Sequence, residues 1–197
     1  DRPFLMLRKM ADEALSKLRA GLRVLMREGS ASADLAAYLK IVTEEKVDTR
    51  HISMISDDID ALHIDRLGHL DHKVRMAVRA GVPSMQAIQM VTINPAESLK
   101  IDHEAGSITP GKFADIVFLS SLEACRVEKV ISKGVLAVEG GKLSVELPVP
   151  EYGDNLMKTI RLKNAVAARD MVIRVPDDKK QATVWVIGAS GTSLLTD

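Results

Sequence analysis

Two adjacent carboxylates, Asp57 and Asp58, follow the apolar run ISMIS at residues 52–56. A short run rich in Ile and Met is typical of a buried strand. Carboxylates at the tips of parallel strands bind metal ions or transfer protons in α/β enzymes, because the strand holds the oxygen at the mouth of the sheet. Asp is also a common helix cap and loop residue. Asp57 is therefore a candidate metal ligand and acid/base group, with capping as the alternative.

A second set of polar residues lies in the segment MREGS at residues 26–30, which also follows a strand-like stretch. It contains Arg27, Glu28 and Ser30. Successive strands of a parallel sheet bring their tips to one face, so these residues are expected to line the same pocket mouth as Asp57. The alternative is that Arg27 and Glu28 form a surface ion pair.

Histidine is the usual transition-metal ligand and proton carrier, and the chain has five histidines but no His-x-His pair. His69 and His72 are one helical turn apart, a spacing that can hold a metal ion if a third ligand is near. Without that ligand, His72 is expected on a helix surface. His69 follows Gly68, which lets the backbone approach a cleft, so His69 is a candidate substrate contact.

The elements that position these residues alternate between helix and strand. Apolar spacing predicts a helix from Ala11 to about Gly21, then a strand at 22–30, a helix at 32–45 capped by Ser32, and a strand at 51–56. Helices are expected at 70–81 and 84–100, the second ending near Asn94 before a proline. This order predicts an α/β layer with a parallel sheet.

The pattern changes after Gly106 to short β-rich runs at 114–120, 126–134 and 135–147, with a Gly-Gly hairpin signal. A Pro-rich hinge at 147–154 precedes strand candidates at 158–162, 170–175 and 182–188. Three parts are predicted: 1–104, 105–148 and 149–197. Two α/β strands are few for a parallel sheet, so both chain ends are expected to be cut and apolar surface to be exposed.

Composition argues against several classes of partner. The chain has 27 basic and 27 acidic residues and only 3% aromatic residues, so no nucleic-acid partner is expected. The single cysteine, Cys125, excludes an internal disulfide or a Cys-based zinc site. No segment approaches the roughly 20 apolar residues of a membrane span, and no signal peptide opens the chain. No membrane association is expected, and the location is expected to be cytoplasmic.

Four stretches resemble, in order, the C-terminal half of the amidohydrolase superfamily: MREGSASADL, ISMISDDIDALHIDRLGHLD, AIQMVTINPAESLKI and GSITPGKFADIVFL. The last resembles the segment in which a (β/α)8 barrel returns to a small β-sandwich. The elements REGS, DD and GH in this order narrow the resemblance to bacterial adenine deaminases. The implied fold is α/β: the last barrel strands and helices, a β-sandwich segment and the start of an adenine-deaminase-type C-terminal domain.

The resemblance implies hydrolytic deamination of adenine to hypoxanthine and ammonia at a divalent metal centre of manganese, iron or zinc. Asp57 matches the carboxylate that binds metal and carries protons, while Asp58 matches a neighbouring acid without an assigned role. Arg27, Glu28, Ser30 and His69 are expected near the purine. The superfamily's other metal ligands are missing from this sequence. The chain is therefore expected to be a fragment, inactive alone and without bound metal, of an enzyme that forms a homo-oligomer.

Two alternatives stay open. One is a different amidohydrolase, such as a dihydroorotase-like enzyme acting on a cyclic amide or amidine, because fold does not determine substrate. The other is a noncatalytic assembly module, which predicts a stable protein without metal.

Overall fold

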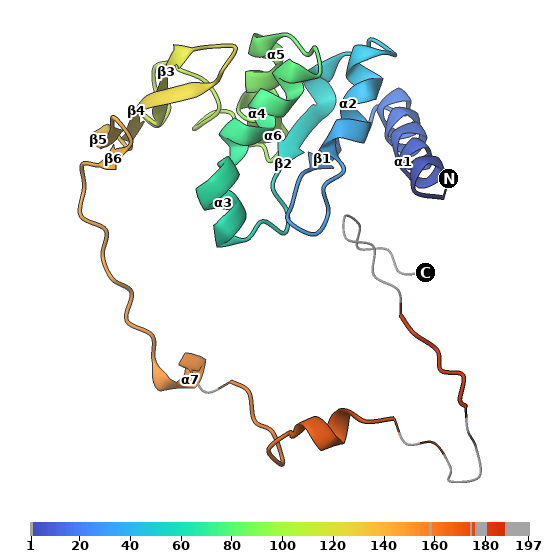
Figure 1. Cartoon of the computed structure of the whole chain (residues 1–197). Helices are drawn as coiled ribbons and strands as arrows, with labels where there is room; N and C mark the ends of the chain where they lie inside the picture. The colour runs from blue at the N-terminus through green and yellow to red at the C-terminus, as the bar shows by residue number, and fades with distance from the viewer. Residues whose placement is uncertain (1, 158, 174, 176–180, 188–197) are drawn as a thin grey trace. The chain divides into compact units, whose positions relative to one another are not determined.

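The computed structural model describes residues 2–157, 159–173, 175 and 181–187 (Figure 1). The described residues up to Val145 form one compact unit, and those from Glu146 onward form a second one. The candidate residues for chemistry all belong to the first unit.

A parallel pair of strands organises the first unit. β1 (Val24–Arg27) and β2 (Ile52–Ile55) lie side by side with Val24 opposite Ile52 and Arg27 opposite Ile55 (Figure 1). Parallel strands need a crossover connection, which α2 (Leu35–Thr43) supplies. α1 (Arg2–Arg19) precedes β1 and contacts α2. The predicted order of helix and strand is confirmed, although the first helix begins earlier than Ala11.

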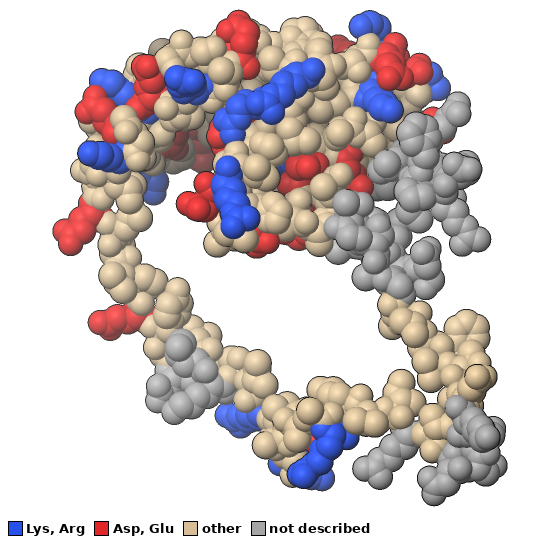
Figure 2. Space-filling model, in the orientation of Figure 1, with Lys and Arg blue, Asp and Glu red and all other residues tan. Residues whose placement is uncertain are grey.

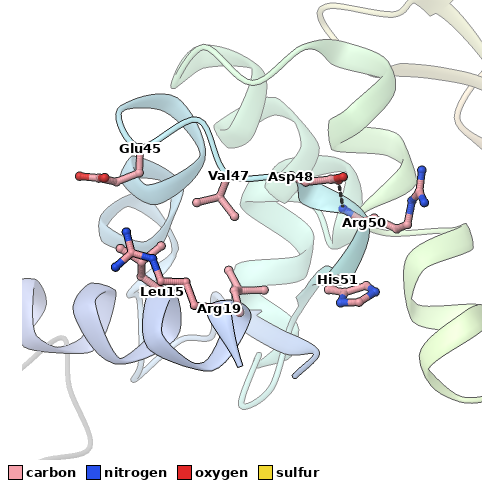
Figure 3. Close-up of a pocket in the computed structure, with 8 residues that line it drawn as sticks. Leu15, Arg19, Glu45, Val47, Asp48, Arg50 and His51 are labelled. Carbon is pink, nitrogen blue, oxygen red and sulfur yellow. Dashed lines mark hydrogen bonds between the residues drawn. The ribbon is translucent and has the colours of Figure 1, made fainter. Parts of the chain in front are cut away.

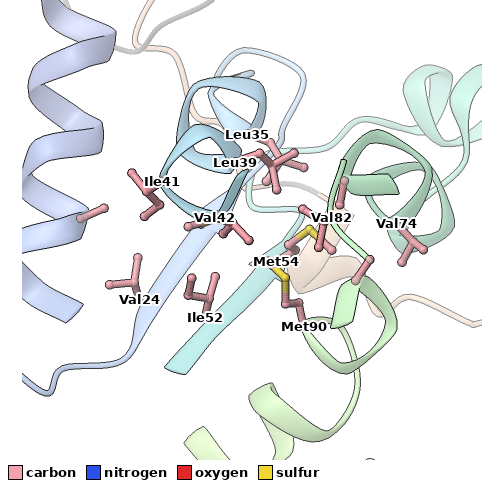
Figure 4. Close-up of a cluster of buried hydrophobic side chains, with 14 of the residues drawn as sticks. Val24, Leu35, Leu39, Ile41, Val42, Ile52, Met54, Val74, Val82 and Met90 are labelled. Carbon is pink, nitrogen blue, oxygen red and sulfur yellow. The ribbon is translucent and has the colours of Figure 1, made fainter. Parts of the chain in front are cut away.

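Apolar side chains from both strands and from the helices that cover them make the core. Met26, Leu35, Leu39, Ile52 and Met54 are each at most 2% exposed, and Figure 4 shows side chains of α2 and β2 converging. Complete burial of such a side chain contributes roughly 1.5–3 kcal/mol. This packing holds the carboxyl ends of β1 and β2 in a constant relative position.

The other face of β1 is uncovered within the described residues. Leu25 alternates with the buried Val24 and Met26 and is 55% exposed. Successive strand residues point to opposite faces, so a one-sided helical layer leaves this side chain in solvent. The apolar exposure predicted from the small number of strands is confirmed here.

Helical segments follow β2, beginning with α3 (Ala61–Leu67) and α4 (Leu70–Arg79). The single helix predicted at 84–100 is wrong, because it is divided into α5 (Ser84–Gln89) and α6 (Ile93–Ser98). Asn94 and Pro95 do not end a helix but lie in the first turn of α6, where the missing proline N–H has no helical partner to lose.

Asn94 joins α6 to the entrance of β2. Its buried Nδ2 donates to the carbonyl oxygens of Thr49 and Ile52, both at 2.8 Å. Thr49 belongs to η1 (Thr49–His51), the short helix that leads into β2. The buried amide thus joins α6 to two carbonyl oxygens at the start of β2, and these bonds satisfy its own donors.

The β-rich segment forms one four-stranded antiparallel sheet. Its order is β3 (Ile116–Ser121), β4 (Arg126–Ser132), β5 (Val135–Glu139) and β6 (Lys142–Leu143). Two-residue loops at 133–134 and 140–141 have positive φ at both positions, as a type I′ turn requires. The Gly-Gly hairpin is confirmed. Closure into a sandwich stays a prediction, as does the barrel.

The second unit has little regular structure in its described residues: α7 (Asp154–Met157) and η2 (Ala168–Met171). The sequence predicts strands at 158–162, 170–175 and 182–188. The described residues of these ranges contain no strand and include part of η2, so the prediction is wrong for them. Lys158, Arg174 and Gly188 lie outside the described residues. A strand requires a neighbour for its backbone groups, and here Ile160 and Trp185 are at least 84% exposed. The domain boundaries 104 and 148 stay predictions.

Charged side chains of both signs are interspersed on the face seen in Figure 2, consistent with the balance of 27 basic and 27 acidic residues. Among the residues that the structure describes, no helix has the length and apolar character to cross a membrane.

Candidate active site

Arg27 and Asp57 meet at the carboxyl ends of the two parallel strands. Arg27 is the last residue of β1, and its Nη1 donates to Asp57 Oδ2 at 3.0 Å. The Arg27 Nε lies 3.6 Å from Asp34 Oδ2, so one guanidinium links two acids. The hydrogen bond to Asp57 is the main cause of a raised pKa for Arg27. The sequence-based alternative, an Arg27–Glu28 ion pair, is wrong.

Asp57 stands two residues past β2 in an uncommon backbone conformation, with φ of +55°. A non-glycine residue in this left-handed region is found most often for Asn and Asp, and such strain gathers at functional sites. Its side chain is 42% exposed and accepts the bond from Arg27. Asp57 therefore presents a carboxylate at the mouth of the sheet, where a ligand can reach it.

Glu28 caps the helix that follows β1. Its Oε2 accepts the N–H of Leu35, the first residue of α2, at 3.0 Å. The predicted cap, Ser32, is wrong: its Oγ instead donates to Asp34 Oδ2 at 2.9 Å. Desolvation raises the pKa of Glu28, although the Leu35 N–H and the charge of Lys73 oppose that shift. One oxygen of Glu28 is thus committed to the fold.

Lys73 of α4 is a buried cation close to these groups. Its side chain is 0% exposed, and its Nζ donates to the His69 carbonyl oxygen at 3.5 Å. Burial lowers its pKa, while the charges of Glu28 and Asp71 raise it. A buried ammonium is costly unless anions compensate it. Lys73 therefore provides part of the positive potential beneath Glu28.

His69 and Ser30 each form a hydrogen bond with a residue within three positions of Asp57 in the chain. His69 Nε2 and Ser56 Oγ lie 2.7 Å apart in a hydrogen bond, and Ser56 directly precedes Asp57 in the chain. Ser30 Oγ accepts the N–H of Asp60 at 2.9 Å. The structure thus brings Arg27, Glu28 and Ser30 to the same end of the β1–β2 pair as Asp57, as predicted for successive strand tips. His69 also lies there, through its bond to Ser56, and any contact of these residues with substrate stays a prediction.

The donor set does not form a complete metal site within the described residues. They contain no group of three or more His, Cys, Asp or Glu side chains able to hold an ion. Asp57 has the guanidinium of Arg27 next to it, and zinc in a catalytic site typically has three protein ligands. The spacing of His69 and His72 does not produce such a site, and desolvation lowers the pKa of His72, which lies half-buried on α4.

A hollow of about 510 Å³ lies at the opposite, amino end of the strands (Figure 3). It is lined by α1 and by the segment before β2, including Arg19, Glu45, Asp48, Arg50 and His51. None of the candidate residues contributes to it. Parallel barrels hold their chemistry at the carboxyl ends of strands, so this hollow is not assigned as the active site.

Three members of the site, Asp34, Ser56 and Lys73, were missed in the sequence. Ser56 had a positional signal, because it closes the apolar run directly before Asp57. Lys73 had a weaker one: it lies one residue before the buried Val74 and four before the buried Ala77, and so on the inner face of α4. Asp34 showed no signal beyond standing before an apolar stretch.

Comparison with known proteins adds the family. A model of the amidohydrolase family matches residues 8–137. The chain belongs to the amidohydrolase family. It is 42% identical over 170 residues to an adenine deaminase of Clostridium botulinum, a match covering 86% of this chain and 28% of that protein.

Other relatives of this amidohydrolase chain carry the same description. It is 41% identical over 180 residues to adenine deaminase 1 of Latilactobacillus sakei, covering 91% of this chain and 30% of the relative. It is 44% identical over 158 residues to adenine deaminase 4 of Rhizobium meliloti, covering 80% and 26%. The chain therefore spans less than a third of the length of these relatives.

Among solved structures, the chain is similar to a β-aspartyl dipeptidase of Fervidobacterium islandicum AW-1, with a TM-score of 0.55 and 17% identity. The match covers 71% of this chain and 39% of that one. At this identity the likeness concerns the fold alone, and it agrees with an amidohydrolase α/β architecture.

Proposed function

We propose that this chain is part of an enzyme that hydrolyses adenine to hypoxanthine and ammonia. The observation that carries the proposal is the Arg27–Asp57 pair at the carboxyl ends of β1 and β2, where parallel α/β enzymes hold their catalytic groups. Identities of about 40% to adenine deaminases over most of the chain support the choice of substrate.

In the proposed reaction, water adds to the purine carbon that bears the amine, a C–O bond forms and the C–N bond breaks. One proton passes from the attacking water to the departing nitrogen, which leaves as ammonia. Asp57 is proposed to carry that proton, because an exposed carboxylate can first accept it and then donate it. Arg27 would hold the carboxylate in place through the 3.0 Å hydrogen bond.

The proposed enzyme works at a divalent metal centre of manganese, iron or zinc, with Asp57 as one ligand. The described residues supply that one donor, so the further ligands are proposed to belong to parts of the intact protein outside this chain. This chain alone is proposed to be inactive. Glu28, Ser30 and His69 are proposed to face the purine, each already held by one of the contacts described above. A cytoplasmic location and a homo-oligomeric state stay predictions.

The test is an assay of the intact protein, supplied with Mn²⁺, Fe²⁺ or Zn²⁺ in turn, with adenine and with dihydroorotate as a cyclic-amide comparison. The expected result is that adenine is converted to hypoxanthine and ammonia and that dihydroorotate is not turned over. Turnover of dihydroorotate but not adenine would replace the substrate and keep the family. No turnover of either compound would favour a noncatalytic assembly module.

A further inference from the structure

The loop from Glu28 to Ala33 carries two of the candidate substrate contacts and closes on itself. Glu28 and Ala33 form an isolated antiparallel bridge, and the Gly29 N–H donates to the Ser32 carbonyl at 2.8 Å. We call residues 28–33 the tip loop. The Glu28 N–H donates to the Ile55 carbonyl of β2 at 3.0 Å and holds the start of the loop, so a further contact must hold the residues after Glu28 beside Asp57.

Asp58 provides that contact with both backbone and side chain. Its carbonyl oxygen accepts the Ser30 N–H at 3.2 Å, and its Oδ2 accepts the Ala31 N–H at 2.7 Å. The next residues add the bond from the Asp60 N–H to Ser30 Oγ at 2.9 Å. The tip loop is thus attached to the segment just after β2 at three points, two of them from Asp58.

The other carboxylate oxygen of Asp58 lies against Gly29. A Cβ built at Gly29 would overlap Asp58 Oδ1 and lie 2.6 Å from its Cγ. The φ of Gly29 is not left-handed, so its backbone conformation does not require glycine. The requirement is steric, because only a residue without a Cβ permits the close approach of the Asp58 carboxylate.

Asp58 Oδ1 is buried and has no hydrogen-bond partner among the described residues. Oδ2 accepts the Ala31 N–H, so the hydrogen bond of the Asp58 side chain is made to the tip loop. An unsatisfied buried oxygen carries a free-energy cost and calls for an explanation. The position of the oxygen over Gly29 is that explanation, since it brings the other oxygen onto the tip loop.

We infer that Asp58 is a positioning residue that clamps the tip loop, through Ala31 and the space left by Gly29, so that Glu28 and Ser30 face the ligand beside Asp57. The kinetic part of this inference rests on the proposed function. The structural part, a direct coupling between positions 29 and 58, does not.

The test is a double-mutant cycle in the intact protein with Gly29→Ala, Asp58→Ala and the double variant, and with Asp65→Ala on the exposed face of α3 as control. Each single clamp variant is expected to raise KM for adenine about 10- to 100-fold, because misplacement of a binding group by about 1 Å has effects of that size. The change in kcat is expected to stay below about threefold. The double variant should be no worse than the worse single one, since a Cβ at position 29 overlaps only the Asp58 carboxylate, and its next contact, the Asp58 backbone N at 3.2 Å, requires a shift of only a few tenths of an ångström.

Asp58→Asn distinguishes a clamp from a catalytic acid. The Asn carbonyl can still accept the Ala31 N–H. The KM of Asp58→Asn is therefore expected within about tenfold of the wild-type value and clearly below the KM of Asp58→Ala. A loss of kcat equal in the Asn and Ala variants would overturn the inference, and so would single effects that multiply in the double variant.

The same cycle read by melting temperature does not require activity. A smaller shift in the double variant than the sum of the two single shifts supports the clamp even if adenine is not the substrate. Additive shifts overturn the clamp even if adenine is turned over. Failure of the proposed function and failure of this inference therefore give different results.

Discussion

Replacing Asp57 by Asn is expected to abolish turnover without disturbing the fold. Asn is close in size and shares the tolerance of Asp for the left-handed conformation, so the φ of +55° is kept without added strain. Asp57→Ala would be less informative, because alanine at such a φ costs roughly 1–2 kcal/mol. The Asn variant therefore separates chemistry from folding.

The cost in stability follows from the contacts. Among the residues that the structure describes, Asp57 forms one ion pair, with Arg27, and the two side chains are 42% and 29% exposed. Exposed pairs of this kind contribute about 0.2–1 kcal/mol, and the Asn carbonyl still accepts the Arg27 bond. The change in unfolding free energy is therefore expected below about 1 kcal/mol.

The cost in rate is expected to be far larger. Proton transfer by a positioned group contributes about 10²- to 10⁴-fold, and the Asn amide cannot perform it. The measurement is hypoxanthine formation by the intact protein, with urea unfolding on the same samples and Asp65→Asn as an exposed control on α3. A variant at position 57 with a rate within about tenfold of wild type would refute the assignment, whatever its stability.

Two further predictions concern the elements that support the site. Desolvation raises the pKa of Glu28 above its ordinary value of 4.5, so the folded protein retains a proton that the unfolded chain has released, and stability falls as pH rises from 4.5 through the folded pKa. Glu28→Gln keeps an acceptor for the Leu35 N–H and should not lose stability in this way. The measurement is the urea midpoint of both proteins as a function of pH, and parallel curves for the two proteins would contradict the burial of Glu28. Asn94→Ala should lower the unfolding free energy by about 2–4 kcal/mol, because it removes both bonds to the Thr49 and Ile52 carbonyls; a loss below about 0.5 kcal/mol in urea unfolding would contradict that role.

Local sequence signals are enough to locate much of the site. The apolar run before Asp57 and the segment before Arg27 predict two strands, and the order of helices between them predicts that they are parallel, which is confirmed. Because parallel strands end at the same edge, the two tips are expected together, and the structure places Arg27 Nη1 3.0 Å from Asp57 Oδ2. The Gly-Gly hairpin is predictable for a similar reason, since positive φ at both positions is a local demand.

Which residues form hydrogen bonds and ion pairs with one another depended on the tertiary structure. Arg27 pairs with Asp57 across 30 residues of chain rather than with its neighbour Glu28, and Ala31 bonds to Asp58 across 27. Glu28, rather than Ser32, caps α2. Asn94, where the spacing predicts the end of a helix, instead lies in the first turn of α6 and bonds to the Thr49 and Ile52 carbonyls. Periodicity reports which side of an element is apolar, whereas these contacts depend on how the elements meet in space. Residue types and order therefore determined that a carboxylate would stand at a strand tip, and only the packed chain decided which group holds it there.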